Sequence, residues 1–196
     1  MLDHVFIDAI GALRDALESA LLERMVPEER FQVDVLLGDT TWETCYGLPG
    51  EGSPPRVRAD ITLDWPTWSQ SAFRSWLRRE EPDDDPRIEI SVVLRLERLI
   101  EPPMPADILA VLPAESPAVG PEGLHRTAPT VETVYTSDLD PIGHALEVGY
   151  EGSYELDDKA LGDGSLLDDH FSALGGWIAS MLVRLGDLPL AYRDVR

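Results

Sequence analysis

The clearest pattern in this chain is an alternation of apolar and polar residues over 87–99. The apolar positions are Ile88, Ile90, Val92, Leu94 and Leu96, and the polar positions are Glu89, Ser91, Arg95 and Glu97. Val93 is the one apolar residue on the polar side. A period of two predicts a β-strand with one buried face. Such a strand needs neighbouring strands to pair with and a second layer to cover its apolar face.

The pattern of apolar and polar residues also predicts the other helices and strands. Apolar residues at steps of three and four predict helices over 3–25, from Thr67 onward, and from about 166 to 185. Alternating or β-branched runs predict strands over 31–37, 41–46, 56–65, 130–135 and 146–156. The run from Thr67 to Gln70 matches a capping box with Thr67 as the N-cap residue. Because glycine weakens a helix, Gly175-Gly176 predicts a close neighbour at that point of the last helix.

A proline-rich stretch divides the chain. Residues 101–129 hold seven of the 16 prolines, which favours a long loop with one short helical turn. The predicted element order is α-βββ-α-β, then the loop, then ββ-α. This order predicts one α+β domain over 1–196, an antiparallel sheet with helices packed on one face. The loop would separate an N-terminal part, 1–100, from a C-terminal part, 130–196.

This element order, in an acidic chain, resembles that of type III secretion chaperones and YbjN-like proteins. The resemblance rests on the order of elements and implies an α+β fold. Function does not follow from it, because one fold hosts many activities.

Charge narrows the choice of partner. The chain has 37 acidic and 16 basic residues, a formal net charge of −21. This charge repels phosphate backbones and anionic lipid, so we expect neither nucleic-acid nor membrane binding. Between Thr127 and Val183 there are eleven acidic residues and one basic residue, Lys159. Such an imbalance is explained either by solubility or by a protein partner with a basic surface, which it would attract electrostatically.

Cysteine use and the N-terminus indicate a cytoplasmic protein. Cys45 is the only cysteine, which excludes an intramolecular disulfide and a cysteine-based zinc site. Residues 1–4 show no basic start of a signal peptide, and no apolar run reaches the roughly 18 residues of a membrane span. No phosphate-loop, dinucleotide, nucleophile-elbow or zinc-protease motif is present, so we expect no cofactor.

Two groups of residues are candidates for partner binding. Trp65, Trp68 and Trp76 lie within twelve residues, either as interface anchors or as side chains that pin a helix on the sheet. Glu147, Glu151 and Glu155 share one face of a predicted strand, either as a binding row or as a solvated face. Four residues along a strand span about 13 Å. This spacing exceeds the ~5–9.5 Å between paired carboxylates of glycosidases.

Asp138, Asp140 and His144 form the cluster that most resembles an enzyme site. Two carboxylates and an imidazole are suitable ligands for a divalent metal ion. The alternative is an ordinary turn before Pro141.

The leading hypothesis is therefore a non-catalytic binding module: a chaperone, an adaptor or an immunity-type inhibitor of a basic partner. One alternative is a metal-assisted hydrolase or transferase at Asp138, Asp140 and His144. The other is a structural subunit of a larger assembly, with 101–129 as a docking arm. A homodimer is compatible with each of them.

Overall fold

The computed structural model describes residues 2–21, 30–33, 38–48, 55–156 and 164–193. These residues form one antiparallel sheet of eight strands together with four helices. The helices are α1 (Leu2–Leu21), α2 (Thr67–Leu77), α3 (Pro105–Leu109) and α5 (Gly164–Gly186). The strands are β1 (Arg30–Val33), β2 (Thr40–Gly47), β3 (Val57–Trp65), β4 (Arg87–Leu99), β5 (Glu115–Val119), β6 (Glu122–Arg126), β7 (Thr130–Tyr135) and β8 (Pro141–Glu155). The predicted α+β class and antiparallel sheet are confirmed.

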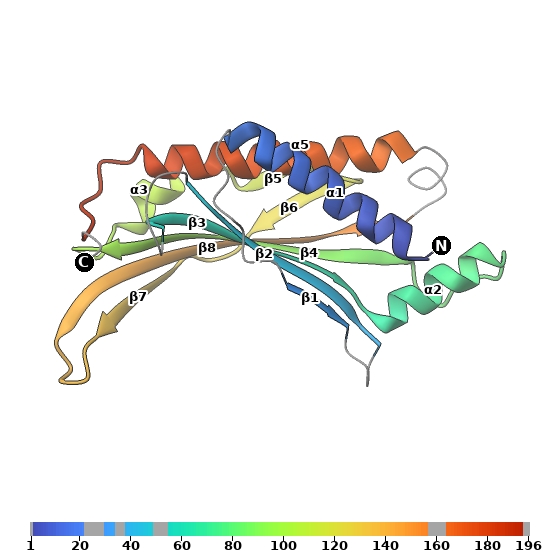
Figure 1. Ribbon diagram of the computed structural model, residues 1–196, viewed down its shortest axis with the longest axis horizontal. Helices are drawn as coiled ribbons and strands as arrows, with labels where there is room; N and C mark the ends of the chain where they lie inside the picture. Colours follow the sequence, from blue (N-terminus) through green and yellow to red (C-terminus); the bar gives the residue numbers. More distant parts are fainter. Residues whose placement is uncertain (1, 22–29, 34–37, 49–54, 157–163, 194–196) are drawn as a thin grey trace.

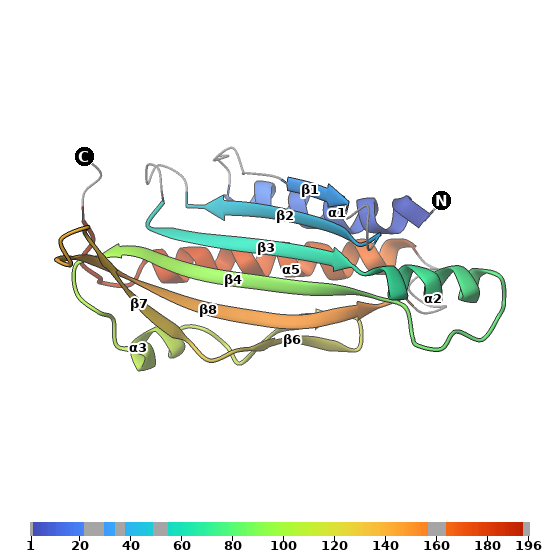
Figure 2. The ribbon, with the colours of Figure 1, turned by 90° about the horizontal axis from the view of Figure 1, so that it is seen from below.

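The strand with the clearest alternation, β4, lies inside the sheet. The strand order is β1-β2-β3-β4-β8-β6-β5, and β7 pairs with β8 outside this path. β4 pairs with β8 from Arg87 opposite Glu155 to Leu99 opposite His144. Strands from both predicted parts of the chain therefore share one continuous sheet. Figure 2 shows β4 running beside β8 along most of its length.

Two helices cover one face of this sheet. α1 and α5 lie side by side across it (Figure 1). A Cβ atom added at Gly175 of α5 would lie 2.6 Å from the carbonyl oxygen of Leu13 in α1. The predicted close neighbour is thus confirmed for Gly175. At Gly176 an added Cβ would meet nothing within 4 Å.

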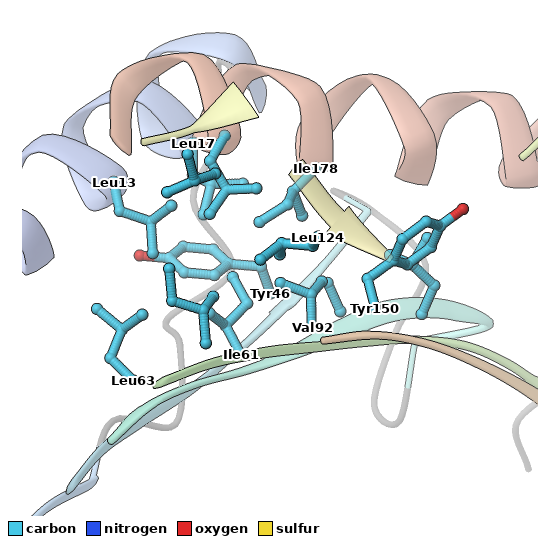
Figure 3. Close-up of a cluster of buried hydrophobic side chains, with 14 of the residues drawn as sticks. Leu13, Leu17, Tyr46, Ile61, Leu63, Val92, Leu124, Tyr150 and Ile178 are labelled. Carbon is cyan, nitrogen blue, oxygen red and sulfur yellow. The ribbon is translucent and has the colours of Figure 1, made fainter. Parts of the chain in front are cut away.

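The core lies between these helices and the sheet. Figure 3 shows Leu13 and Leu17 of α1 and Ile178 of α5 facing side chains that rise from the sheet. The labelled sheet residues are Tyr46, Ile61, Leu63, Val92, Leu124 and Tyr150. Burial of each large apolar side chain contributes about 1.5–3 kcal/mol. This burial is the reason that β3, β4 and β8 alternate so regularly.

The start of α2 differs from the predicted capping box. The N-cap is Pro66, and Asp39 Oδ1 accepts hydrogen bonds from Thr67 N (2.6 Å) and Thr67 Oγ1 (2.9 Å). The Gln70 amide donates to the carbonyl oxygens of Trp65 (2.8 Å) and Gly38 (2.9 Å). The capping-box prediction is wrong because a side chain 28 residues earlier supplies the acceptor.

Ser69 fastens α2 to the sheet. Its buried hydroxyl accepts from Trp65 Nε1 (3.2 Å) and Arg87 N (2.7 Å) and donates to the Arg87 carbonyl (2.6 Å). These bonds hold α2 beyond the ends of β3 and β4 (Figure 2).

The stretch 101–129 is more ordered than a loop. It contains α3 and the strands β5 and β6, which pair with each other, while β6 also pairs with β8. Pro117 is tolerated in β5 because this strand is the last in the order and needs no donor on its outer side. Arg126 Nη1 donates to the carbonyl oxygens of Leu109 (3.3 Å) and Leu112 (2.5 Å), so it satisfies the end of α3.

Two predicted elements extend past the described chain: residues 22–25 of the first helix and 34–37 of the first strand lie outside it. No helix within the described residues is both long and apolar enough to cross a membrane.

Candidate functional site

The face of the sheet opposite α1 and α5, here called the open face, has no helix over it in the described chain (Figure 1). Alternation places polar and small side chains there because their neighbours point into the core. They are Arg58, Asp60, Thr62 and Asp64 of β3, Arg87, Glu89, Ser91, Val93, Arg95 and Glu97 of β4, and Glu147, Gly149, Glu151, Ser153 and Glu155 of β8.

A network of ion pairs crosses the middle of the open face. Arg58 and Arg95 are directly opposite each other in β3 and β4, which alone would be repulsive. Arg58 lies 3.4 Å from Asp60 and 3.3 Å from Glu97. Arg95 lies 2.5 Å from Glu147 and 3.5 Å from Glu97. The carboxylates therefore neutralise the two arginines.

An acidic hollow of about 420 Å³ lies beside this network. Asp64, Glu89 and Glu151 line it together with one basic residue, Arg87, and Ser91 lies between Thr62 and Glu151 in the register. Asp64 and Glu89 are directly opposite each other, an arrangement that is unfavourable for like charges. None of the three carboxylates forms an ion pair with a described residue; Asp64 Oδ1 accepts a hydrogen bond from Thr41 Oγ1 at 2.6 Å. With three carboxylates and one guanidinium, that of Arg87, the lining keeps an excess of negative charge and is suited to a positive group.

A larger groove, of about 1020 Å³, lies on the other side of the network. The end of β4, the β7–β8 hairpin and residues 192–193 line it. Its apolar side chains are Ile100, Val134, Ile142 and Tyr192, and its charged ones are Arg95, Glu97, Arg98, Glu132 and Arg193. Exposed isoleucine and valine beside charged groups are typical of a surface that receives apolar side chains.

The three predicted tryptophans lie in different surroundings. Trp65 is 2% exposed and stacks on Phe6 at 5.9 Å, so it belongs to the core. Trp76 is partly buried and stacks on Phe73 at 5.8 Å. Trp68 is 37% exposed, with the Arg87 guanidinium 4.7 Å from its ring centroid. Among these three, Trp68 is the one most open to a partner.

The predicted glutamate row lies along β8 on the open face. Glu147 is held by Arg95, Glu151 lines the acidic hollow, and Glu155 is exposed opposite Arg87. The three side chains thus lie on the same face of the sheet but have different neighbours.

The predicted metal ligands do not come together. The described residues contain no group of three or more His, Cys, Asp or Glu side chains placed to hold a metal ion. Asp138 and Asp140 are exposed at the tip of the β7–β8 hairpin, where both backbone N–H groups donate to Thr136 Oγ1. The His144 ring lies 3.1 Å from Thr133 Oγ1. The cluster is organised as a turn.

The single cysteine has a thiol of low reactivity. Cys45 lies opposite Asp60 on the open face. Burial, and then the hydrogen bond to Asp60 and its charge, raise the pKa of the Cys45 thiol from 9.0 to about 12. Because the thiolate is the nucleophile, Cys45 is not activated for covalent catalysis.

The sequence did not single out Asp64, Glu89 or Arg95 as site residues. Their strands were predicted, and their polar side was visible in the alternation. The register that brings Asp64 beside Glu89, and Arg95 beside Glu147, was not visible, because pairing depends on the folded sheet.

Comparisons with protein-family models, curated proteins and solved structures found no match. The features that bear on function are therefore those of the open face itself: the ion-pair network, the acidic hollow and the larger groove.

Proposed function

We propose that this protein is a non-catalytic binding module that holds a basic segment of another protein against its open face. The observation that carries the proposal is the acidic hollow, where Asp64 and Glu89 lie opposite each other across β3 and β4 and the three lining carboxylates outnumber the one lining cation, Arg87. A lysine or arginine of the partner would relieve that repulsion on binding.

The layout of the open face suggests how such a segment lies. Along β4 the hollow is near Ser91, the ion-pair network is at Arg95, and the groove extends to Ile100. A partner with a basic residue at one end and an apolar residue at the other would match this order. Trp68, next to the hollow through Arg87, offers an aromatic contact at the rim.

The test is recovery of the partner from the protein's own cells with a tagged chain, at low and at high salt. We expect a stoichiometric protein with a basic surface that is lost at high salt, because exposed charge pairs are screened. The double variant Asp64→Asn, Glu89→Gln should weaken its binding by about tenfold or more.

The matched control is Asp168→Asn, Asp169→Asn, which removes the same charge from exposed positions of α5. It should leave binding and its salt dependence nearly unchanged. Equal loss in both double variants would show that only net charge matters, and no loss in the hollow variant would refute this site. The expected compartment is the cytoplasm, which cell fractionation checks.

A further inference from the structure

The outer edge of β7 lacks most of the features that protect the edges of a sheet. β7 pairs with β8 on one side and with no other described strand, and all six of its residues are exposed. Natural sheets shield such edges with short strands, prolines, bulges or lysines. β1 has four residues, and β5 contains Pro117 and an irregular register. The sequence of β7, Thr-Val-Glu-Thr-Val-Tyr, has no proline or lysine, and the irregularity in its pairing with β8 is confined to its last step, between Val134 and Tyr135.

This edge also carries exposed apolar side chains. Val131, Val134 and Tyr135 are 39%, 46% and 55% exposed, on a hairpin that projects away from the helices (Figure 1). Val131 is opposite Leu146, a core residue, so it points to the helix-covered side of the sheet. By alternation Thr133 points the same way, and Glu132 and Val134 point to the open face. The register shift between Val134 and Tyr135 leaves the extra residue in β8, so the alternation within β7 continues and Tyr135 points to the same side as Thr133.

We infer that β7 pairs with β7 of a second copy of this chain, antiparallel and across a two-fold axis. In such a pair, residues directly opposite must point to the same side of a continuous sheet. The axis therefore passes through a residue and not between two residues. Only axes at Glu132 or Thr133 pair five of the six residues of β7.

Side-chain chemistry selects between these two axes. An axis at Glu132 places two carboxylates directly opposite each other, which is destabilising. An axis at Thr133 places Thr133 opposite its own copy and Val131 opposite Tyr135 of the second copy, on both sides of the axis. Threonine pairs and aromatic–β-branched pairs stabilise antiparallel strands. The same strand is thus complementary to itself in one register.

Electrostatic repulsion predicts how this association depends on salt concentration. Each copy carries a net charge of −21, so two copies repel at low salt. At 0.15 M salt the screening length is about 8 Å, so the repulsion between the two copies is weakened. The short-range contacts of β7 then determine whether the dimer forms. The dimer should become tighter as salt rises, whereas binding of a basic partner should become weaker. The two proposals can therefore fail separately.

The first experiment is sedimentation equilibrium of the full chain over a range of concentrations and salt. We expect a monomer–dimer equilibrium that shifts toward the dimer with salt. Val131→Lys and Tyr135→Lys should each weaken the dimer by about tenfold or more, since edge lysines oppose strand addition. Val183→Lys, at a residue of α5 that is 47% exposed, is the matched control and should leave it unchanged.

The second experiment tests the register by disulfide formation in a Cys45→Ser background. Residues opposite each other across an antiparallel pair have Cα atoms about 4.5–5.5 Å apart, within disulfide range. Thr133→Cys should therefore form a cross-linked dimer on mild oxidation. Glu132→Cys should not, because its copy is a diagonal neighbour at about 7–8 Å.

A monomer at every concentration and salt would overturn the inference. So would a dimer that survives both lysine variants, or one that cross-links through Glu132→Cys and not through Thr133→Cys. Melting curves of each variant check that the chain remains folded. Apart from the Cys45→Ser background that they share, the cysteine variants change only exposed side chains of β7 and add no charge to the edge.

Discussion

At the scale of single residues, Cys45 shows how a neighbouring carboxylate changes the reactivity of a thiol. The thiol is half-buried on β2, and Asp60 of β3 lies opposite it. Burial and the Asp60 carboxylate both disfavour the thiolate, and together they outweigh the opposing effect of Arg58 on the pKa. A sequence that shows one cysteine says nothing about this, because Asp60 is 15 positions away and reaches Cys45 only through the β2–β3 register.

We predict that Cys45 of the native chain reacts very slowly with iodoacetamide at pH 8. With a pKa near 12 in the folded chain and 9.0 as the ordinary value, the thiolate fraction should be about a thousandfold lower than in unfolded chain. Asp60→Asn should increase the rate, because it removes a cause of the raised pKa. Glu43→Gln, a nearby acid that is not among those causes, is the control and should not.

The same pKa makes stability depend on pH. Above pH 9.0 the unfolded thiol loses its proton, while the folded thiol keeps it up to about pH 12. The free energy of unfolding contributed by this group is therefore complete below pH 9.0 and decreases through this window. Cys45→Ser should remove that part of the alkaline decrease.

At the scale of elements, the contact between α1 and α5 depends on one glycine. A Cβ at Gly175 would lie 2.6 Å from the Leu13 carbonyl oxygen and 3.0 Å from Ala16 Cβ. Both atoms belong to α1, and a backbone oxygen cannot turn aside as a flexible side chain can. Gly175 therefore sets the distance between the two helices that cover the core.

We predict opposite effects for alanine at the two adjacent glycines. Gly175→Ala should lower the free energy of unfolding by about 1–3 kcal/mol, because α1 must shift. Gly176→Ala should raise it by up to about 1 kcal/mol, since alanine favours a helix and nothing lies within 4 Å. Urea unfolding of the two variants measures both changes. Destabilisation by Gly176→Ala would contradict the packing described here.

At the scale of the whole molecule, the pairing of β4 with β8 joins the N-terminal part of the chain to the C-terminal part. β4 belongs to the first hundred residues and β8 to the C-terminal part, yet they share most of their length in register. α1 and α5, from opposite ends of the chain, pack together above them. Most of the core therefore depends on contacts between distant parts of the sequence.

We predict that the described fold unfolds in one cooperative step. Four of the five tryptophans precede residue 80, and Trp177 lies in α5. Fluorescence of the Trp177→Phe variant, which reports on the N-terminal part, should give the same denaturation midpoint as far-ultraviolet circular dichroism. Two separate midpoints would indicate that 1–100 and 130–196 unfold independently.

The sequence alone determined the elements that alternate or repeat strongly. β3, β4 and β8, and most of α1 and α5, follow from hydrophobic periodicity, because one face of each must be buried. β7, whose six residues are all exposed, follows from its β-branched residues instead. The sequence also determined the charge and the close approach at Gly175. These are local properties, which depend only on residues that are close together in the sequence.

Only the tertiary structure decided which residues meet. The acceptor for the start of α2 is Asp39, and the donor that closes α3 is Arg126, each far from its partner in sequence. The sheet register made Asp64 and Glu89 neighbours and left the β7 edge exposed. Alternation determines which face of the sheet a side chain points to, but not which residue of the neighbouring strand lies opposite it. Pairing is therefore settled only when the whole sheet forms.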